Sequence, residues 1–448
     1  ETTHMKISIF LLILAGQGIQ PDTVMLSLEN AVSRALEANP TLQAQRAKAE
    51  ARAQLPLQAS PAFLPSVSLG LQGMKTTDPV GVFGLKLRQE NFAAEDLSLD
   101  ALNRPDAYSG YNATATVQMP ILAPEGIYGF QAARKAAEAE EAGARRAAGA
   151  TRFFTVQAYT GAILAARQVM ALDAALDAVD GHVDQAEAMH EQGLVTGLDA
   201  RMAGLKASEI EVHRLSAAAQ AQNALSALKA LLDLPESTEV VLTDDLSALT
   251  LASECATGEG HPADGCSWEE RGDLQAYTAG AEAASKGVKK AWASQLPALA
   301  AFGAVGHYAQ DAPFSNGSGD WTFGIGLSWT PFNGLAGVGA VRAAKAEEVA
   351  VKAERNAALR QAEVEVLQAL RMLEAAEQGA EVAGRASAEA QIALEQAGAR
   401  YTSGTAPITE LLDVQAASTN ATLSELAARR DLVLAHAALD LAYGVFDR

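Results

Sequence analysis

Residues 320–330 read Asp-Trp-Thr-Phe-Gly-Ile-Gly-Leu-Ser-Trp-Thr, a stretch in which large apolar residues alternate with small or polar ones. Trp321, Phe323 and Ile325 share one face, and Thr322 lies on the other. This alternation predicts a β-strand, and its length suits a tilted strand that crosses a bilayer in about 9–11 residues. A half-buried strand of a soluble sheet alternates in the same way, so both interpretations stay open at this point.

Three other segments have the same character, and the third is the weakest: residues 66–72, 111–119 and 299–308. Four strands are too few to close a barrel, and unpaired sheet edges are not tolerated in hydrocarbon. If these strands lie in a membrane, several chains must therefore share one barrel. Three chains would supply about twelve strands.

The chain contains an internal duplication, which explains why the strands come in two groups. Pro65 recurs 232 positions later as Pro297, whereas Gly193 recurs 211 positions later as Gly404. The change of offset places the extra residues of the first half in a loop of its β-hairpin. The predicted organisation is a first repeat at 26–235, a linker at 236–271 and a second repeat at 272–445, with hairpins at about 65–120 and 297–331.

A very long helix follows each hairpin, predicted over residues 126–192 and 337–402, and each would measure roughly 100 Å. In the second one Leu359, Val366 and Leu373 recur every seven residues, which is typical of a coiled-coil seam. A lone helix of this length cannot bury its apolar face, so neighbouring helices are required. Shorter helices are predicted to cover the long ones at residues 28–59, 199–233, 274–294 and 409–442.

The composition excludes several classes of protein. The 448 residues carry a net charge of −20, which argues against a nucleic-acid partner because phosphate binding needs basic surface. Aromatic residues make up only 5%, and much of the 49% apolar content is alanine, which favours long helices. HExxH, P-loop and GxSxG motifs are absent from the sequence. We therefore predict no catalytic residues, no metal site and no cofactor.

The first residues predict export. Met5 and Lys6 precede a short apolar run that ends at Ala15, followed by small residues, as in a secretory signal peptide over about residues 1–18. The run is too short for a membrane-spanning helix. A buried N-terminal strand or helix is the alternative. Residues 1–4 precede the apparent start and are interpreted as an expression remnant.

The two cysteines, Cys255 and Cys266, lie in the linker with His261 between them. Three potential ligands without a fourth make a poor zinc site. An oxidising compartment would permit a disulfide between them, and a pair of free thiols is the alternative.

Similar motifs end the two long helices: Glu-Gln-Gly-Leu-Val at 191–195 and Arg-Tyr-Thr-Ser-Gly-Thr at 400–405. Arg-Gly-Asp-Leu at 271–274 and the Leu-Pro pairs that precede the strands complete the pattern. These motifs resemble those of the TolC-type outer-membrane efflux duct family in their order, their repetition in both halves and their spacing, over about residues 26–445. The resemblance implies a mainly α protein with a membrane β-barrel: a homotrimer whose twelve-stranded β-barrel, four strands per chain, is continuous with a long α-helical barrel.

The same resemblance implies a function and a place in the cell. The chain would be a passive exit duct, and not an enzyme, in a tripartite efflux or type I secretion system. It would lie in outer-membrane lipid of a Gram-negative bacterium, with most of the chain in the periplasm. A periplasmic adaptor protein and an inner-membrane pump would open it.

Site residues follow from the resemblance one by one. Tyr401 matches a tyrosine that hydrogen-bonds between neighbouring helices in the closed gate, and Asp199 matches its carboxylate partner. Glu410 and Asp413 match two acidic positions at the tunnel mouth, and Ala406 stands where some members carry an arginine that locks the gate. The adaptor-docking helix tips correspond to Gly193, Leu194, Val195, Gly404 and Thr405. A solvated acidic pair near a helix N-terminus is the alternative for Glu410 and Asp413.

Two further interpretations complete the expectations. A trimeric structural or adhesive surface stalk would also use four strands per chain, but its strands would be consecutive at the C-terminus. The long loop between Lys75 and Gly110 is predicted to lie at the extracellular mouth and to fold partly over it.

Overall fold

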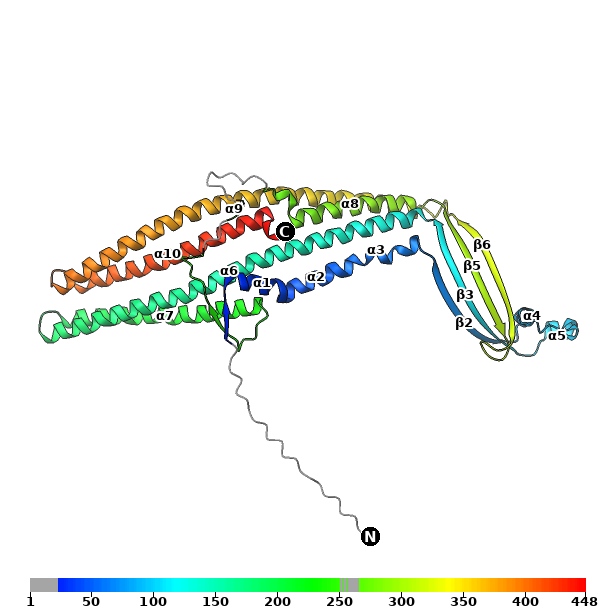
Figure 1. Ribbon diagram of the computed structural model, residues 1–448, viewed down its shortest axis with the longest axis horizontal. Helices are drawn as coiled ribbons and strands as arrows, with labels where there is room; N and C mark the ends of the chain where they lie inside the picture. The colour runs from blue at the N-terminus through cyan, green and yellow to red at the C-terminus, as the bar shows by residue number, and fades with distance from the viewer. Residues whose placement is uncertain (1–22, 250–252, 254, 256–265) are drawn as a thin grey trace, which may run out of the picture. The chain divides into compact units, whose positions relative to one another are not determined.

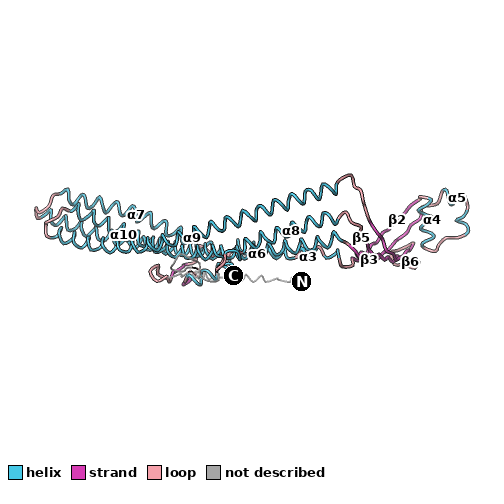
Figure 2. Tube along the Cα trace, turned by 90° about the horizontal axis from the view of Figure 1, so that it is seen from above, coloured by secondary structure: helices cyan, strands magenta, loops and turns pink. Residues whose placement is uncertain are grey.

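The computed structural model describes residues 23–249, 253, 255 and 266–448. The predicted signal peptide and much of the linker lie outside the described residues. Apart from a four-stranded sheet and one short strand pair, the regular structure of the described chain is helical (Figure 2).

The chain divides into two compact units, and the long helices α6 (Pro124–Glu191) and α9 (Ala336–Thr402) contribute to both. Both helices agree closely with the predicted ranges. Of the described residues, the first unit comprises 23–40, 150–249, 253, 255 and 369–440, and the second comprises 41–149, 266–368 and 441–448.

The second unit contains the sheet, whose antiparallel strands lie in the order β2-β3-β5-β6 (Figure 1). All four predicted strands are confirmed, although β6 begins three residues before the predicted stretch 320–330 and ends two residues before its end. Because β3 pairs with β5, the two predicted hairpins join into one sheet. The strands are β2 (Ser66–Thr76), β3 (Tyr108–Leu122), β5 (Ala298–Ala309) and β6 (Gly317–Ser328).

The strand register sorts the side chains of this sheet into two different faces. Leu69 pairs with Ala115, Ala115 with Val305, and Val305 with Trp321, so these residues share one apolar face. Its large side chains are exposed in the single chain: Val67, Leu69, Leu71, Val117, Val305, Trp321, Phe323, Ile325 and Leu327. The opposite face is mostly polar or small, with Asn112, Thr114, Thr116, Gln118 and Thr322, and it also carries the rings of Phe302 and Tyr308.

Helices of the second unit pack beside the first part of α6 and the first part of α9. Helix α8 (Gly272–Ala293) contacts both, because Glu282 pairs with Lys135 at 2.9 Å and Thr278 accepts a hydrogen bond from Arg355 at 3.2 Å. The second unit also contains the shorter helices α2 (Pro40–Ala53) and α3 (Leu55–Gln58).

The Arg-Gly-Asp-Leu motif forms a buried ionic cluster at the start of α8. Arg271 is only 3% exposed, and its guanidinium lies 2.7 Å from Asp273 and 2.8 Å from Glu365. Burial opposes ionisation of Asp273, but the hydrogen bonds from Arg271 and the charge of Arg146 hold the pKa of this carboxyl below its usual range. Gly272 lies against α6, since a Cβ there would approach the carbonyl oxygen of Ala142 to 2.6 Å.

The long segment between β2 and β3 is not an irregular loop. It contains α4 (Pro79–Arg88) and the short α5 (Leu99–Asn103). Asp78 caps α4 by accepting a hydrogen bond from the Gly81 amide at 2.6 Å, and Pro79 occupies the first turn, where a missing N–H costs nothing.

The first unit contains α1 (Leu28–Ala38), α7 (Gly197–Leu231) and α10 (Ile408–Tyr443) with the second parts of α6 and α9. The helix predicted over residues 28–59 is wrong as a single element. Asn39 is not helical because Pro40 follows it, so α1 ends and α2 begins there.

A parallel pair of short strands in the first unit was not predicted: β1 (Thr23–Leu26) lies beside β4 (Glu239–Leu242). Tyr159 anchors this pair, since its buried hydroxyl lies 2.8 Å from the Leu26 carbonyl oxygen and 2.9 Å from the Asp244 carboxylate. Burial and then the Asp244 carboxylate raise the pKa of Tyr159 to about 12.

Of the linker residues, Cys255 and Cys266 are both disulfide-bonded.

Candidate functional site

The two long helices end in the same backbone motif. Gly193 and Gly404 have φ values of +74° and +71°, in the left-handed region that favours glycine. The amide of the next residue, Leu194 or Thr405, donates to a carbonyl oxygen five residues earlier at 2.9 Å in both cases. This is the Schellman ending of a helix, and its repetition agrees with the internal duplication.

The predicted docking residues present an exposed surface at these tips. Gly193, Leu194, Gly404 and Thr405 are exposed, and Val195 is half-buried. The first tip carries His190, whose Nδ1 lies 3.2 Å from the Val195 carbonyl oxygen. The tips therefore share a backbone but differ in the side chain that precedes the turn.

Tyr401 precedes the second turn and is only 2% exposed. It belongs to an apolar cluster in which residues of α6, α7 and α10, including Leu172, Ile210 and Leu411, meet the end of α9. Within the described part of the chain its buried hydroxyl has no hydrogen-bond partner. Burial, and then the negative charge of Asp199, raise the pKa of Tyr401.

In the single chain no hydrogen bond joins Tyr401 to Asp199, so their predicted pairing in a closed gate stays a prediction. The Asp199 carboxylate instead accepts hydrogen bonds from the amide and the hydroxyl of Thr196, both at 2.8 Å. This reciprocal arrangement caps the start of α7. Asp199 is thus engaged locally, while the Tyr401 hydroxyl is left unsatisfied.

Of the two acidic positions, Glu410 is paired and Asp413 is exposed. Glu410 forms a salt bridge with Arg400, which joins the end of α9 to the start of α10. Both side chains are partly exposed, so this pair adds little to stability. Sequence reasoning missed the partner, although Arg400 stands in the quoted tip motif. Ala406, where some members of the resembled family carry an arginine, lies between Arg400 and Glu410 in the sequence, and its side chain is buried.

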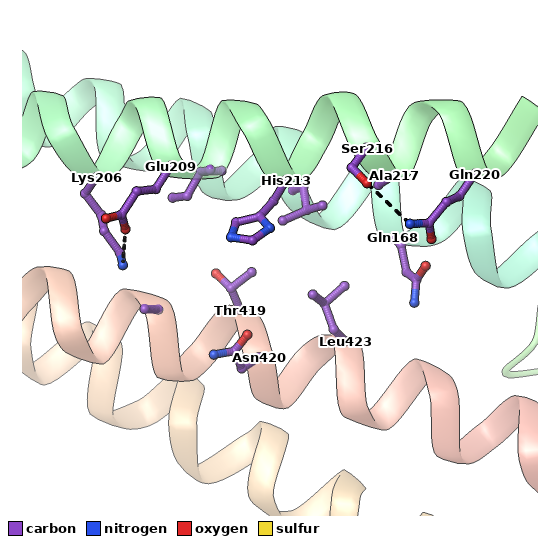
Figure 3. A pocket seen from close by; sticks show the side chains of 13 residues that line it. Gln168, Lys206, Glu209, His213, Ser216, Ala217, Gln220, Thr419, Asn420 and Leu423 are labelled. Carbon is purple, nitrogen blue, oxygen red and sulfur yellow. Dashed lines mark hydrogen bonds and ion pairs between the residues drawn. The ribbon is translucent and has the colours of Figure 1, made fainter.

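A cavity of about 340 Å³, lined by both polar and apolar side chains, lies among α6, α7 and α10 in the same unit (Figure 3). His213 of α7 points toward Thr419 of α10, and Lys206 pairs with Glu209 at 2.8 Å beside it. The sequence could not reveal this cavity because α7 and α10 come from different repeats.

Across the described residues, His, Cys, Asp and Glu side chains form no group of three or more that could hold a metal ion. Of the helices described, none is long and apolar enough to cross a membrane.

The chain is similar to known proteins in two comparisons. Residues 267–445 match the family model described as outer membrane efflux protein. No curated protein matches. A membrane protein from Pseudomonas aeruginosa has the same fold with a TM-score of 0.78 and 21% identity, over 93% of this chain and 92% of that one.

Two further solved structures lead to the same result. The outer membrane protein VceC from Vibrio cholerae matches with a TM-score of 0.75 and 20% identity, over 93% of this chain and 96% of that one. The CmeC outer membrane channel of Campylobacter jejuni matches with a TM-score of 0.77 and 17% identity, over 93% and 85%. Residues 267–445 thus match the outer membrane efflux protein family, and along nearly its whole length the chain has the fold of these outer-membrane channel structures.

Proposed function

We propose that the chain is one protomer of a homotrimeric exit duct in the outer membrane of a Gram-negative bacterium. One observation carries this proposal: the sheet has one largely apolar face, one largely polar face and free edges. Among the described residues, β2 and β6 have no further strand beside them. Because unpaired backbone groups are costly in hydrocarbon, the edges must pair with those of other copies.

Three copies supply a closed barrel with an aqueous interior. Twelve strands about 4.8 Å apart and tilted by about 40° enclose a cylinder of about 12 Å radius. The apolar face would then meet outer-membrane lipid, and the polar face would line the channel. The long helices would continue this channel into the periplasm as an α-helical barrel.

The helix tips are the proposed periplasmic gate. Three copies of Glu410 and Asp413 bring six carboxylates around one axis, which attracts cations. The unsatisfied hydroxyl of Tyr401 supports a partner outside the single chain, and Asp199 of a neighbouring hairpin is the proposed acceptor in the closed state. The exposed tip residues Leu194 and Thr405 are the proposed contacts of a periplasmic adaptor.

In this proposal the duct performs no chemistry. A tripartite efflux or type I secretion system would use it as its outer component, and the adaptor and an inner-membrane pump would open the gate. The rival trimeric stalk is disfavoured because β3 and β5, from different repeats, lie side by side at the centre of the sheet.

Planar-bilayer recordings of the detergent-purified protein test the proposal. We expect small, cation-selective channels. The double variant Glu410→Gln, Asp413→Asn should lose cation selectivity and block by divalent ions, while Leu194→Ala serves as a tip variant of unchanged charge. Unchanged selectivity in the double variant would remove the two carboxylates from the gate, and absence of any channel would refute the duct.

A further inference from the structure

Helix α4 lies at the end of the strands of the sheet (Figure 1). Gly110 of β3 belongs to the polar face, because it is two residues before Asn112 in the same regular strand. A Cβ at Gly110 would approach Gln89 Nε2 to 2.7 Å and Leu85 Cδ2 to 2.8 Å. The end of α4 is thus seated where only a glycine leaves room.

Polar contacts fix the helix in this position. The buried Gln89 donates from Nε2 to the Ala309 carbonyl oxygen of β5 at 3.1 Å and accepts from the Tyr108 hydroxyl at 2.9 Å. The Arg88 guanidinium stacks over the Tyr308 ring, 5.4 Å from its centre. Both polar atoms of the Gln89 amide are therefore hydrogen-bonded to groups of the strands, as expected for a buried polar side chain in an ordered contact.

The opposite face of α4 is apolar and mostly exposed in the single chain, with Phe83 packed edge-to-face against Phe92 at 5.0 Å between ring centres. Val80, Phe83 and Leu87 recur at helical spacing and are all exposed, whereas Val82 and Leu85 on the docked face are buried. Gly84 lies in the middle of the uncovered face, and a Cβ there would meet no atom within 4 Å. An exposed apolar face on a short helix is typical of an interaction surface.

We propose that this face, formed by Val80, Phe83, Gly84 and Leu87, contacts the same face of two other copies and closes the extracellular mouth of the duct. The inference rests on the proposed trimeric barrel. A helix is about 10–12 Å in diameter with its side chains, and the barrel radius is about 12 Å. Three helices docked on the luminal wall therefore reach the axis and meet there, which makes a second copy of the chain the occupant.

This contact would make the mouth a second barrier, separate from the helix tips. A substrate would pass only when α4 leaves Gly110 and Tyr308 or when the three helices separate. Both movements break a small number of contacts, so the cap is a device that opens and closes at modest cost.

Cysteine crosslinking of the full-length protein tests the contact. Because both native cysteines are disulfide-bonded, Val80→Cys would be the only free thiol of its chain. Leu99→Cys is a matched control, since Leu99 lies on α5 of the same segment and is 79% exposed, against 78% for Val80. Oxidation should convert Val80→Cys into covalent dimers approaching about two thirds of the chains, because one thiol of every three around a threefold axis stays unpaired.

Three outcomes are distinguishable. Trimers in which Val80→Cys forms dimers and Leu99→Cys does not would support the cap. Trimers in which the two variants crosslink equally poorly would overturn the cap and leave the duct intact. A protein that is folded but not trimeric would overturn both.

A second variant keeps the test independent of disulfide geometry. Leu87→Glu would place three carboxylates around the axis and drive the helices apart, so single-channel conductance should rise, whereas Leu99→Glu should leave it unchanged. Equal conductance of Leu87→Glu and the parent protein would contradict the proposal.

Discussion

Replacing Phe323 by arginine tests whether the apolar face of the sheet meets lipid. Phe323 lies in the middle of β6, is 70% exposed in the single chain, and faces the same side as Trp321 and Ile325. An arginine at the midplane of a barrel wall costs about 2–4 kcal/mol on the lipid side. That cost corresponds to roughly a 30- to 900-fold shift of the folding equilibrium per chain.

The adjacent residue supplies a matched control. Thr322 is also exposed but faces the polar side, so Thr322→Arg should leave the stability nearly unchanged and alter only the conductance. Unfolding by urea in lipid vesicles, followed by tryptophan fluorescence, measures both variants. If Phe323→Arg is no less stable than Thr322→Arg, the apolar face does not contact lipid and the assignment of the two faces is wrong.

Three further predictions concern the tips, the ionic cluster and the docked helix. Gly404→Ala should lower the free energy of unfolding by about 1–2 kcal/mol, because φ is positive at this position. Gly398→Ala, inside α9, should instead raise it by about 0.5–1 kcal/mol. Equal effects of the two variants in thermal denaturation would refute the turn argument. Because folding lowers the pKa of Asp273 from its ordinary value of 3.8, the stability it contributes is complete above that value and is lost as the pH falls below it. Asp273→Asn should therefore unfold with a weaker pH dependence in acid, and an unchanged acid transition would show that the cluster is not responsible. Gln89→Ala should release α4 and speed proteolytic cleavage of the segment between β2 and β3, a result that limited digestion with the parent as control would establish or exclude.

The strands and the long helices could be predicted because their signals are local and repeated. The alternation around Phe323 fixed both the position of β6 and its faces, and the seven-residue spacing of Val366 and Leu373 predicted the buried stripe of α9. The 211-residue offset then transferred each element to the other repeat. These features depend on periodicity alone, which a single sequence displays.

Other features were missed because they depend on contacts between distant segments. Strands β1 and β4 are four residues long, and only their pairing with each other and the anchor Tyr159 reveal them. Helix α4 has a local signal, since Asp78 and Pro79 form a helix start, but the sequence prediction places a loop without a helix between Lys75 and Gly110. The family resemblance paired Tyr401 with Asp199, yet in the single chain the carboxylate of Asp199 bonds to the nearby Thr196.

The mass of the folded protein in detergent is the most direct test of the central claim that several copies share one barrel. Native mass spectrometry, or light scattering with a detergent correction, should give three chains of 46.6 kDa, less any segment removed on export. The circular-dichroism spectrum of the same sample should show a predominantly helical protein, which establishes that the sample is folded. A folded monomer would contradict the account, because a lone four-stranded sheet would then be stable with both edges open.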